Sequence, residues 1–179
     1  MEPIVIKDFL SDYHFNALKG AMVWNSSFPL YLSSSVSYDN LINSAFWHWY
    51  AAETLYLHPE LRRQGDVTSS YYKDLVRDIF VPQFSKIDVL KDKQISRVKV
   101  NFYPHTWRVR EHGSHTDVDY GTTAAIFGLN TCNGFTRVKG SGKIKSVANQ
   151  LLIFDGLTDH NSSTTSNAKG RFNINFNFI

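Results

Sequence analysis

Residues 171–178 read Arg-Phe-Asn-Ile-Asn-Phe-Asn-Phe, and this stretch decides the fold. Polar and apolar residues alternate along its whole length. Because the side chains of an extended strand point alternately to opposite faces, one face is apolar and the other carries an arginine and a row of asparagines. The apolar face suits packing on helices. The polar face is foreign to an ordinary core and natural in a barrel whose interior holds an ionic ligand.

The same period of two residues begins near Ile95. Apolar residues alternate there with residues that carry polar groups: Val98, Val100 and Phe102 against Lys99, Asn101 and Tyr103. A shorter apolar run at residues 4–6 also predicts a strand. The second half of the chain is therefore expected to be rich in strands.

Helical patterns belong to the first half. We expect one helix from Ser11 or Asp12 to about Val23, and a second that starts at Thr68 or Ser69 and ends at Pro82. Residues 24–63 show no regular pattern. Helices followed by strands predict an α+β fold: a double-stranded β-helix, which is a jelly-roll or cupin-like barrel, with the N-terminal helices packed on one outer face.

Length and composition limit the alternatives. The 179 residues predict a single domain, in which 1–94 is a mostly helical or irregular support and 95–179 forms the barrel core. The net charge of +3 falls short of that expected for a dedicated nucleic-acid binder. No apolar run reaches the roughly 18–20 residues of a membrane helix, and residues 1–8 lack the pattern of a signal peptide. Cys132 is the only cysteine, which suits a reducing compartment. We expect a cytoplasmic protein without membrane association.

His115-Thr116-Asp117 is the first candidate metal-binding segment. On an extended segment, the imidazole of His115 and the carboxylate of Asp117 lie on the same side. With His160 they supply two imidazoles and one carboxylate, the facial triad of non-heme Fe(II) sites, which leaves open positions for chemistry. We therefore predict that His115, Asp117 and His160 bind a metal. Asp119 is a competing carboxylate, which we expect to line the pocket or to cap a turn with Gly121.

Arg171 follows His160 by eleven positions (171 − 160). Its planar guanidinium is a fixed cation that can bind a carboxylate through two hydrogen bonds. The ordered set of His115, Asp117, His160 and Arg171 is much rarer by chance than any one of its parts.

This ordered set resembles the 2-oxoglutarate and Fe(II)-dependent oxygenases, in particular the prolyl 4-hydroxylase-like branch and its short phage or bacterial members. The similarity covers roughly residues 95–179. The matching segments are Asn101-Phe102-Tyr103-Pro104, His115-Thr116-Asp117, Leu129-Asn130, Asn133-Gly134-Phe135-Thr136, Asn149 to Asp155, His160 and Arg171-Phe172-Asn173.

The resemblance implies an enzyme that uses Fe(II), 2-oxoglutarate and O₂ to hydroxylate a C–H bond, with release of succinate and CO₂. It implies that His115, Asp117 and His160 form the catalytic metal site. It also implies that Arg171 receives the distal carboxylate of 2-oxoglutarate. Two sets of residues would complete the cosubstrate site: Asn101 and Tyr103, which would contact the carboxylates, and Asn173, which replaces the Ser or Thr of many relatives.

The prime substrate is less well determined. We favour a protein, a peptide or a free amino acid, because prolyl hydroxylation is the commonest reaction of this branch. A nucleic-acid demethylase stays open because residues 137–145 form a basic hairpin, although that branch carries a second arginine shortly after the first. The hairpin cations are Arg137, Lys139, Lys143 and Lys145. A jelly-roll protein that binds a metal or sugar without oxidation is the third alternative, and it would have no need of Arg171.

The sequence does not fix the roles of one aromatic cluster and of the remaining histidines. The aromatic cluster at 46–50 is interpreted as packing on the sheet, and contact with substrate stays open for this cluster and for the hairpin. His48, His58, His105 and His112 are predicted not to bind the metal, with His105 and His112 as groups near the pocket. The sequence does not indicate an oligomeric state.

Overall fold

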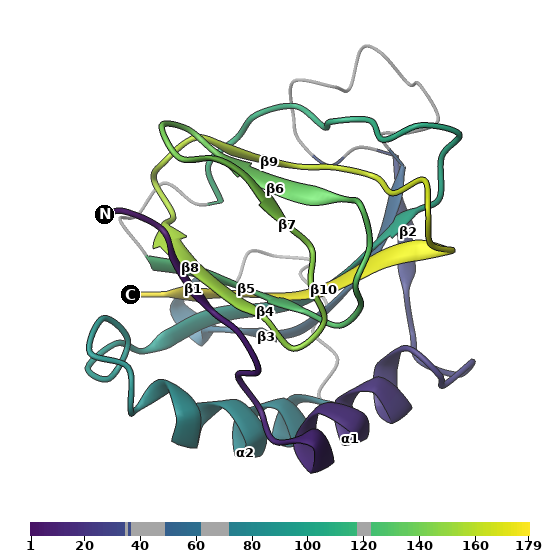
Figure 1. The fold of residues 1–179 in the computed structure, drawn as a ribbon. Coiled ribbons are helices and arrows are strands. Elements are labelled where there is room, and N and C mark those ends of the chain that lie inside the picture. The colour runs from purple at the N-terminus through teal and green to yellow at the C-terminus, as the bar shows by residue number, and fades with distance from the viewer. Residues whose placement is uncertain (35, 37–48, 62–71, 118–122) are drawn as a thin grey trace.

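Two antiparallel sheets lie face to face in the computed structural model, which describes residues 1–34, 36, 49–61, 72–117 and 123–179 (Figure 1). In the large sheet the strand order is β1 (Ile4–Ile6), β8 (Leu151–Asp155), β5 (Thr123–Gly128), β10 (Gly170–Phe178), β4 (Ile95–Pro104), β3 (Tyr50–Leu57) and β2 (Tyr31–Ser33). The small sheet has the order β7 (Gly142–Lys145), β6 (Phe135–Val138) and β9 (His160–Ser162). The helices α1 (Asp12–Met22) and α2 (Lys73–Phe84) cover the face of the large sheet that points away from the small one. This arrangement matches the predicted layers.

Helix α1 forms where the sequence predicts it. Ser11 caps it in an extended conformation, and its side chain accepts a hydrogen bond from His14 N. Leu18 and Met22 are buried against the sheet. Neither α1 nor α2, the α-helices of the described residues, has the length and apolar character that a membrane span requires.

Helix α2 differs from the prediction at its end. The expected start at Thr68 or Ser69 lies outside the described residues, and the helix is seen from Lys73. The expected stop at Pro82 is wrong, because the helix continues through Pro82 to Phe84. Proline in the last turn removes only one backbone donor, and burial of Phe84 in the core offsets that loss.

The first half of the chain contributes more strands than expected. The strand at residues 4–6 is confirmed as β1, which pairs with β8. Residues 24–63 were expected to be irregular, yet they supply β2 and the eight-residue strand β3. The sequence of β3 contains two alanines and a glutamate, which have low strand propensity. Its pairing with β4 makes it a strand, and that pairing is not visible in the local sequence.

The apolar face of β10 builds the core with the helices, as its alternation predicts. Ile174, Phe176 and Phe178 are at most 1% exposed. Phe80 of α2 lies at the centre of an aromatic cluster. Its ring centroid is 4.7 Å from that of Phe176, 5.0 Å from Phe127, 5.5 Å from Phe84 and 6.1 Å from Phe9. The helices are thus fixed to the sheet through side chains of the last strand.

A hydrogen-bonded tie attaches the N-terminal segment to the same sheet. Asn149 has a positive φ of 58°, a conformation that asparagine tolerates better than most residues. Its Oδ1 accepts from Leu10 N at 2.9 Å, and its Nδ2 donates to Leu10 O at 2.8 Å. The chain leading into α1 is therefore held beside the turn before β8.

Replacing Phe80 with alanine tests the packing of the helices. We expect Phe80→Ala to lower the free energy of unfolding by about 3–5 kcal/mol, because the cavity left among four rings cannot collapse fully. The control is Val81→Ala at the next position, where the side chain is 44% exposed and we expect a change within about 0.5 kcal/mol. Chemical denaturation followed by circular dichroism measures both. Equal losses for the two variants would contradict this account of the core.

Candidate functional site

His115 and His160 lie directly opposite each other between the two sheets. The backbone N–H of each donates to the carbonyl of the other at 2.9 Å. Their imidazoles therefore project to the same side, 4.8 Å apart between ring centroids. Asp117 follows two residues after His115 and shares its side. One ligand atom from each of the three residues lies within 4.8 Å of the other two.

Backbone carbonyls orient both imidazoles. Nδ1 of His115 lies 3.2 Å from Gly113 O, and Nδ1 of His160 lies 3.0 Å from Thr158 O. A carbonyl oxygen can only accept, so each Nδ1 carries the proton and each Nε2 keeps a free electron pair. The two Nε2 atoms face Asp117 Oδ1, at 3.9 Å from His115 and 3.6 Å from His160. This donor set fits a divalent metal ion such as Fe(II).

The carboxylate of Asp117 is held from the other side by β10. Asn175 Nδ2 and Asn177 Nδ2 donate to Asp117 Oδ2 at 3.0 Å and 2.9 Å. Arg97 of β4 contacts Oδ1 at 3.4 Å and donates to Asn177 Oδ1 at 2.9 Å. Oδ2 is thus occupied by two amides, while Oδ1 points toward the imidazoles.

The charges of His115, Asp117 and His160 shift one another's pKa values. Burial raises the pKa of Asp117, but His160, Arg97 and the amide of Asn175 outweigh burial and hold that pKa well below its ordinary value. Burial lowers the pKa of His160, but the adjacent carboxylate outweighs it, so the pKa lies above 6.5. Burial lowers the pKa of His115, and the charge of His160 lowers it further. Asp117 is therefore ionised, and His160 accepts a proton before His115 does.

The remaining predicted site residues share one small cavity with the triad. Asn101, Tyr103, Arg171 and Asn173 line this cavity, which has a volume of about 30 Å³. Asn101 Nδ2 donates to Asn173 Oδ1 at 3.2 Å, across the register of β4 and β10. The structure thus brings together all seven residues predicted for the site.

Arg171 is a buried cation, only 2% exposed. Its guanidinium donates to Phe135 O and to Thr136 Oγ1, each at 2.7 Å, while Nε has no hydrogen-bond partner. Burial lowers the pKa of Arg171. A Cβ at Gly134 would lie 3.0 Å from Cδ of Arg171, so glycine leaves room for the arginine. Among the described residues no carboxylate pairs with this charge.

Several contributors to the site were not singled out from the sequence. They are Arg97, Ile126, Thr136 and Ser162, together with the individual roles of Asn175 and Asn177. Arg97 could have been predicted from the sequence, because it lies two residues before Lys99 on the polar side of the same alternating strand. Asp119 and Gly121 lie outside the described residues.

The histidines predicted not to bind the metal and the aromatic cluster lie in different parts of the structure. His112 is buried near the cavity, with its ring 5.1 Å from that of Tyr103 and Nδ1 2.7 Å from Ser162 Oγ. His105 is exposed, with Nδ1 2.9 Å from Ala168 O. Of the aromatic cluster, residues 46–48 lie outside the described residues, whereas Tyr50 begins β3 and stacks on Tyr103.

Two acids from other segments offset half of the positive charge of the basic hairpin. Arg137 and Lys143 pair with Glu111 at 2.8 Å and 3.1 Å, and Lys139 pairs with Asp159 at 2.8 Å. The pKa of Glu111 is lowered to about 2, chiefly by its hydrogen bond from Arg137. The hairpin is therefore less cationic than its sequence suggests.

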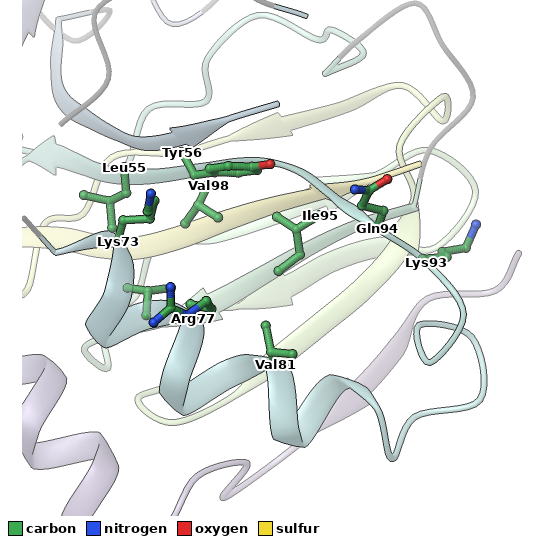
Figure 2. Close-up of a pocket in the computed structure, with 10 residues that line it drawn as sticks. Leu55, Tyr56, Lys73, Arg77, Val81, Lys93, Gln94, Ile95 and Val98 are labelled. Atoms are coloured by element: carbon green, nitrogen blue, oxygen red, sulfur yellow. The ribbon is translucent and has the colours of Figure 1, made fainter. Parts of the chain in front are cut away.

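An apolar pocket of about 440 Å³ lies on the opposite face of the large sheet, between α2 and strands β3 and β4 (Figure 2). Its floor is formed by apolar side chains, and Lys73 and Lys93 stand at its rim. No described residue of the triad lines it, so the candidate chemistry belongs to the smaller cavity.

The chain matches no protein-family model and no curated protein sequence. Solved structures are similar over nearly its whole length. A 2OG-Fe(II) oxygenase family oxidoreductase from Burkholderia pseudomallei superimposes with a TM-score of 0.68 at 9% identity, covering 98% of this chain and 84% of that chain. A prolyl-4-hydroxylase from Pseudomonas putida gives 0.64 at 13% identity, covering 98% and 91%. The viral collagen prolyl hydroxylase of Paramecium bursaria Chlorella virus-1 gives 0.59 at 12% identity, covering 99% and 96%.

At sequence identities this low, these superpositions show a shared fold and no more. The chain has the double-stranded β-helix fold of these proteins, and the predicted fold class is confirmed. The two sheets of the described residues face each other without closing into one continuous barrel.

Removing an amide that holds Asp117 should weaken metal binding. We expect Asn177→Ala to raise the dissociation constant for Co(II), a spectroscopic substitute for Fe(II), by about tenfold or more, because the carboxylate loses its fixed orientation. Visible absorbance during Co(II) titration measures this. Asn16→Ala on the exposed side of α1 is the control and should bind Co(II) as the unaltered protein does. Unchanged affinity in Asn177→Ala would contradict a role in orienting the ligand.

Metal binding should also weaken as the pH falls. A metal needs the unprotonated imidazole, and His160 takes up its proton at a pH above the ordinary 6.5. Below the pKa of His160 one proton competes with the metal, so its dissociation constant should rise about tenfold per pH unit. Co(II) titrations between about pH 8.5 and about pH 5.5 check this expectation. A dissociation constant that does not change with pH would exclude His160 as a ligand.

Proposed function

We propose that this chain is a 2-oxoglutarate- and Fe(II)-dependent dioxygenase that hydroxylates a C–H bond, consuming O₂ and releasing succinate and CO₂. One observation carries the proposal: an assembled His-Asp-His donor set and a buried arginine without a carboxylate partner among the described residues line the same cavity. The fold shared with oxygenases of this class adds support.

His115, Asp117 and His160 would hold Fe(II). With iron and 2-oxoglutarate bound, the site would supply the oxidising power that C–H hydroxylation requires. The protein contributes orientation. The carbonyls of Gly113 and Thr158 fix the imidazoles, and the amides of β10 fix the carboxylate, so the three ligand atoms need little rearrangement to bind a metal.

Arg171 would bind the distal carboxylate of 2-oxoglutarate. A buried guanidinium without a counter-charge is costly, and a carboxylate ligand would remove that cost. The unpartnered Nε supplies a donor in addition to those that already bond Phe135 and Thr136. Asn101, Tyr103 and Asn173 would complete the polar walls around the dicarboxylate.

We further propose that the prime substrate is a protein, a peptide or a free amino acid. Two of the structures that share this fold are named as prolyl hydroxylases, which supports substrates of this kind. The ion pairs of the basic hairpin weaken the alternative of a nucleic-acid demethylase, because Glu111 and Asp159 pair with three of its four cations and offset two of the four positive charges. The buried Arg171 disfavours a metal- or sugar-binding protein without turnover.

Anaerobic titration with Fe(II) and 2-oxoglutarate tests the proposal. We expect a weak visible absorption band when both are present, and slow conversion of 2-oxoglutarate to succinate after O₂ is admitted. Asp117→Ala should abolish both signals, because the proposed iron site loses the carboxylate of its described donor set. If the unaltered protein gives neither the band nor succinate, the proposed activity is wrong.

Arg171→Met separates the cosubstrate site from the metal site within the same experiment. We expect the concentration of 2-oxoglutarate that gives half-saturation to rise by about tenfold or more, because the charge-assisted pair between the guanidinium and the carboxylate is lost. Co(II) affinity should stay unchanged, since Arg171 contacts none of the three ligands. Thermal unfolding shows whether the variant is folded, and Arg171→Lys should recover part of the affinity.

A further inference from the structure

The inner face of β4 carries a lysine that the proposed reaction does not use. Four residues alternate along this face: Arg97, Lys99, Asn101 and Tyr103. Arg97 contacts Asp117, and the last two line the cosubstrate cavity. Lys99 lies between these two groups. Its partner across the strand pair is Asn175, whose amide donates to Asp117. Lys99 is therefore placed beside the metal centre.

The ammonium of Lys99 is held by a tyrosine. Nζ donates to Tyr50 Oη at 2.8 Å and lies 4.8 Å from the centroid of that ring. Tyr50 stacks in turn on Tyr103, with 6.0 Å between the ring centroids. The lysine is half-buried, and no carboxylate of the described residues lies within ion-pair distance of it. It differs in this respect from Lys139 and Lys143 of the hairpin, which have acidic partners.

Charge balance in the interior favours an additional anion. Arg171 and Asp117 line the cavity, and Arg97 and Lys99 lie beside it on the inner face of β4, so these four described side chains carry a net charge of +2 (3 − 1) with the imidazoles neutral. A bound divalent metal and the dianion of 2-oxoglutarate cancel each other. The net charge of +2 therefore persists in the loaded site. A partly desolvated cation of this kind is stabilised by a counter-charge.

The donors left at Lys99 and Tyr50 match a carboxylate. The ammonium uses one N–H on Tyr50 Oη and keeps two, and the tyrosine keeps its own O–H. The two groups can thus each donate to one oxygen of a planar carboxylate.

We propose that Lys99 and Tyr50 bind a carboxylate of the prime substrate, so that the enzyme acts on an acidic peptide or a free acidic amino acid. The inference rests on the proposed function and names the substrate class of the same site. Lys99 is a specificity-determining residue in this account, whereas Arg171 serves the cosubstrate.

The test uses the full chain with Fe(II), 2-oxoglutarate and matched pairs of probes. One pair is a pool of short peptides rich in Asp and Glu and its counterpart with Asn and Gln. A second pair is free aspartate and glutamate against asparagine and glutamine. Succinate formation is one readout, and calorimetric binding of each probe to the anaerobic loaded protein is the other. We expect an acidic probe to be preferred by about tenfold or more, and the two pairs separate peptide from amino-acid substrates.

Three variants test whether Lys99 causes the preference for acidic probes. Lys99→Met should remove it by raising the KM for the acidic probe, with the KM for 2-oxoglutarate unchanged. Lys99→Arg should keep the preference because it keeps the positive charge, and the unchanged KM for 2-oxoglutarate shows that the methionine variant is folded. Lys93→Met is the matched control, since Lys93 lies at the rim of the pocket on the opposite face of the sheet (Figure 2) and should leave every parameter unchanged.

Different results would contradict the acidic substrate class and the dioxygenase activity itself. Absence of both the visible band and succinate in the unaltered protein overturns the proposed function and the inference with it. Succinate formation with equal response to acidic and neutral probes overturns the inference alone. A preference that survives in Lys99→Met, or a stronger response to phosphorylated peptides than to carboxylate-bearing ones, overturns it as well.

Discussion

The buried negative charge of Asp117 is the constraint on which the interior of this protein depends. A carboxylate that is only 6% exposed must be compensated by donors and cations. Asn175 and Asn177 supply the donors, and Arg97 supplies positive charge. This requirement explains why the central strand of the large sheet is polar on one face. The opposite face of the same strand packs against the helices.

The polar interior is divided between two tasks. Toward the start of β10, Arg171 and the paired amides of Asn101 and Asn173 form a wall that suits a dicarboxylate. Toward its end, Asn175 and Asn177 hold the carboxylate of Asp117, the proposed metal ligand. Because β10 pairs with β4 in one continuous register, both tasks are served by the same two strands. The sheet register therefore fixes Arg171 relative to the two amides that hold Asp117.

The sequence predicts the features that repeat at short range. Alternation at 171–178 and the i, i+2 spacing of His115 and Asp117 suffice to anticipate the two-faced strand and the candidate ligands. Features that depend on distant pairing are not visible in this way. Strand β3 exists because β4 lies beside it, and three of the hairpin cations pair with Glu111 or Asp159 from other segments. The end of α2 at Phe84 depends on a core position that outweighs a local proline signal.

The place of β10 also governs when the domain can fold. This strand lies between β5 and β4, yet it is made after every other strand of the sheet. During synthesis the apolar faces of α1 and α2 exist before Phe176 and Phe178 are available to cover them. A chain that stops before Gly170 would leave β4 and β5 with unpaired edges, which are templates for aggregation. Completion of the large sheet therefore waits for residues 170–178, and partial products of synthesis expose these strand edges.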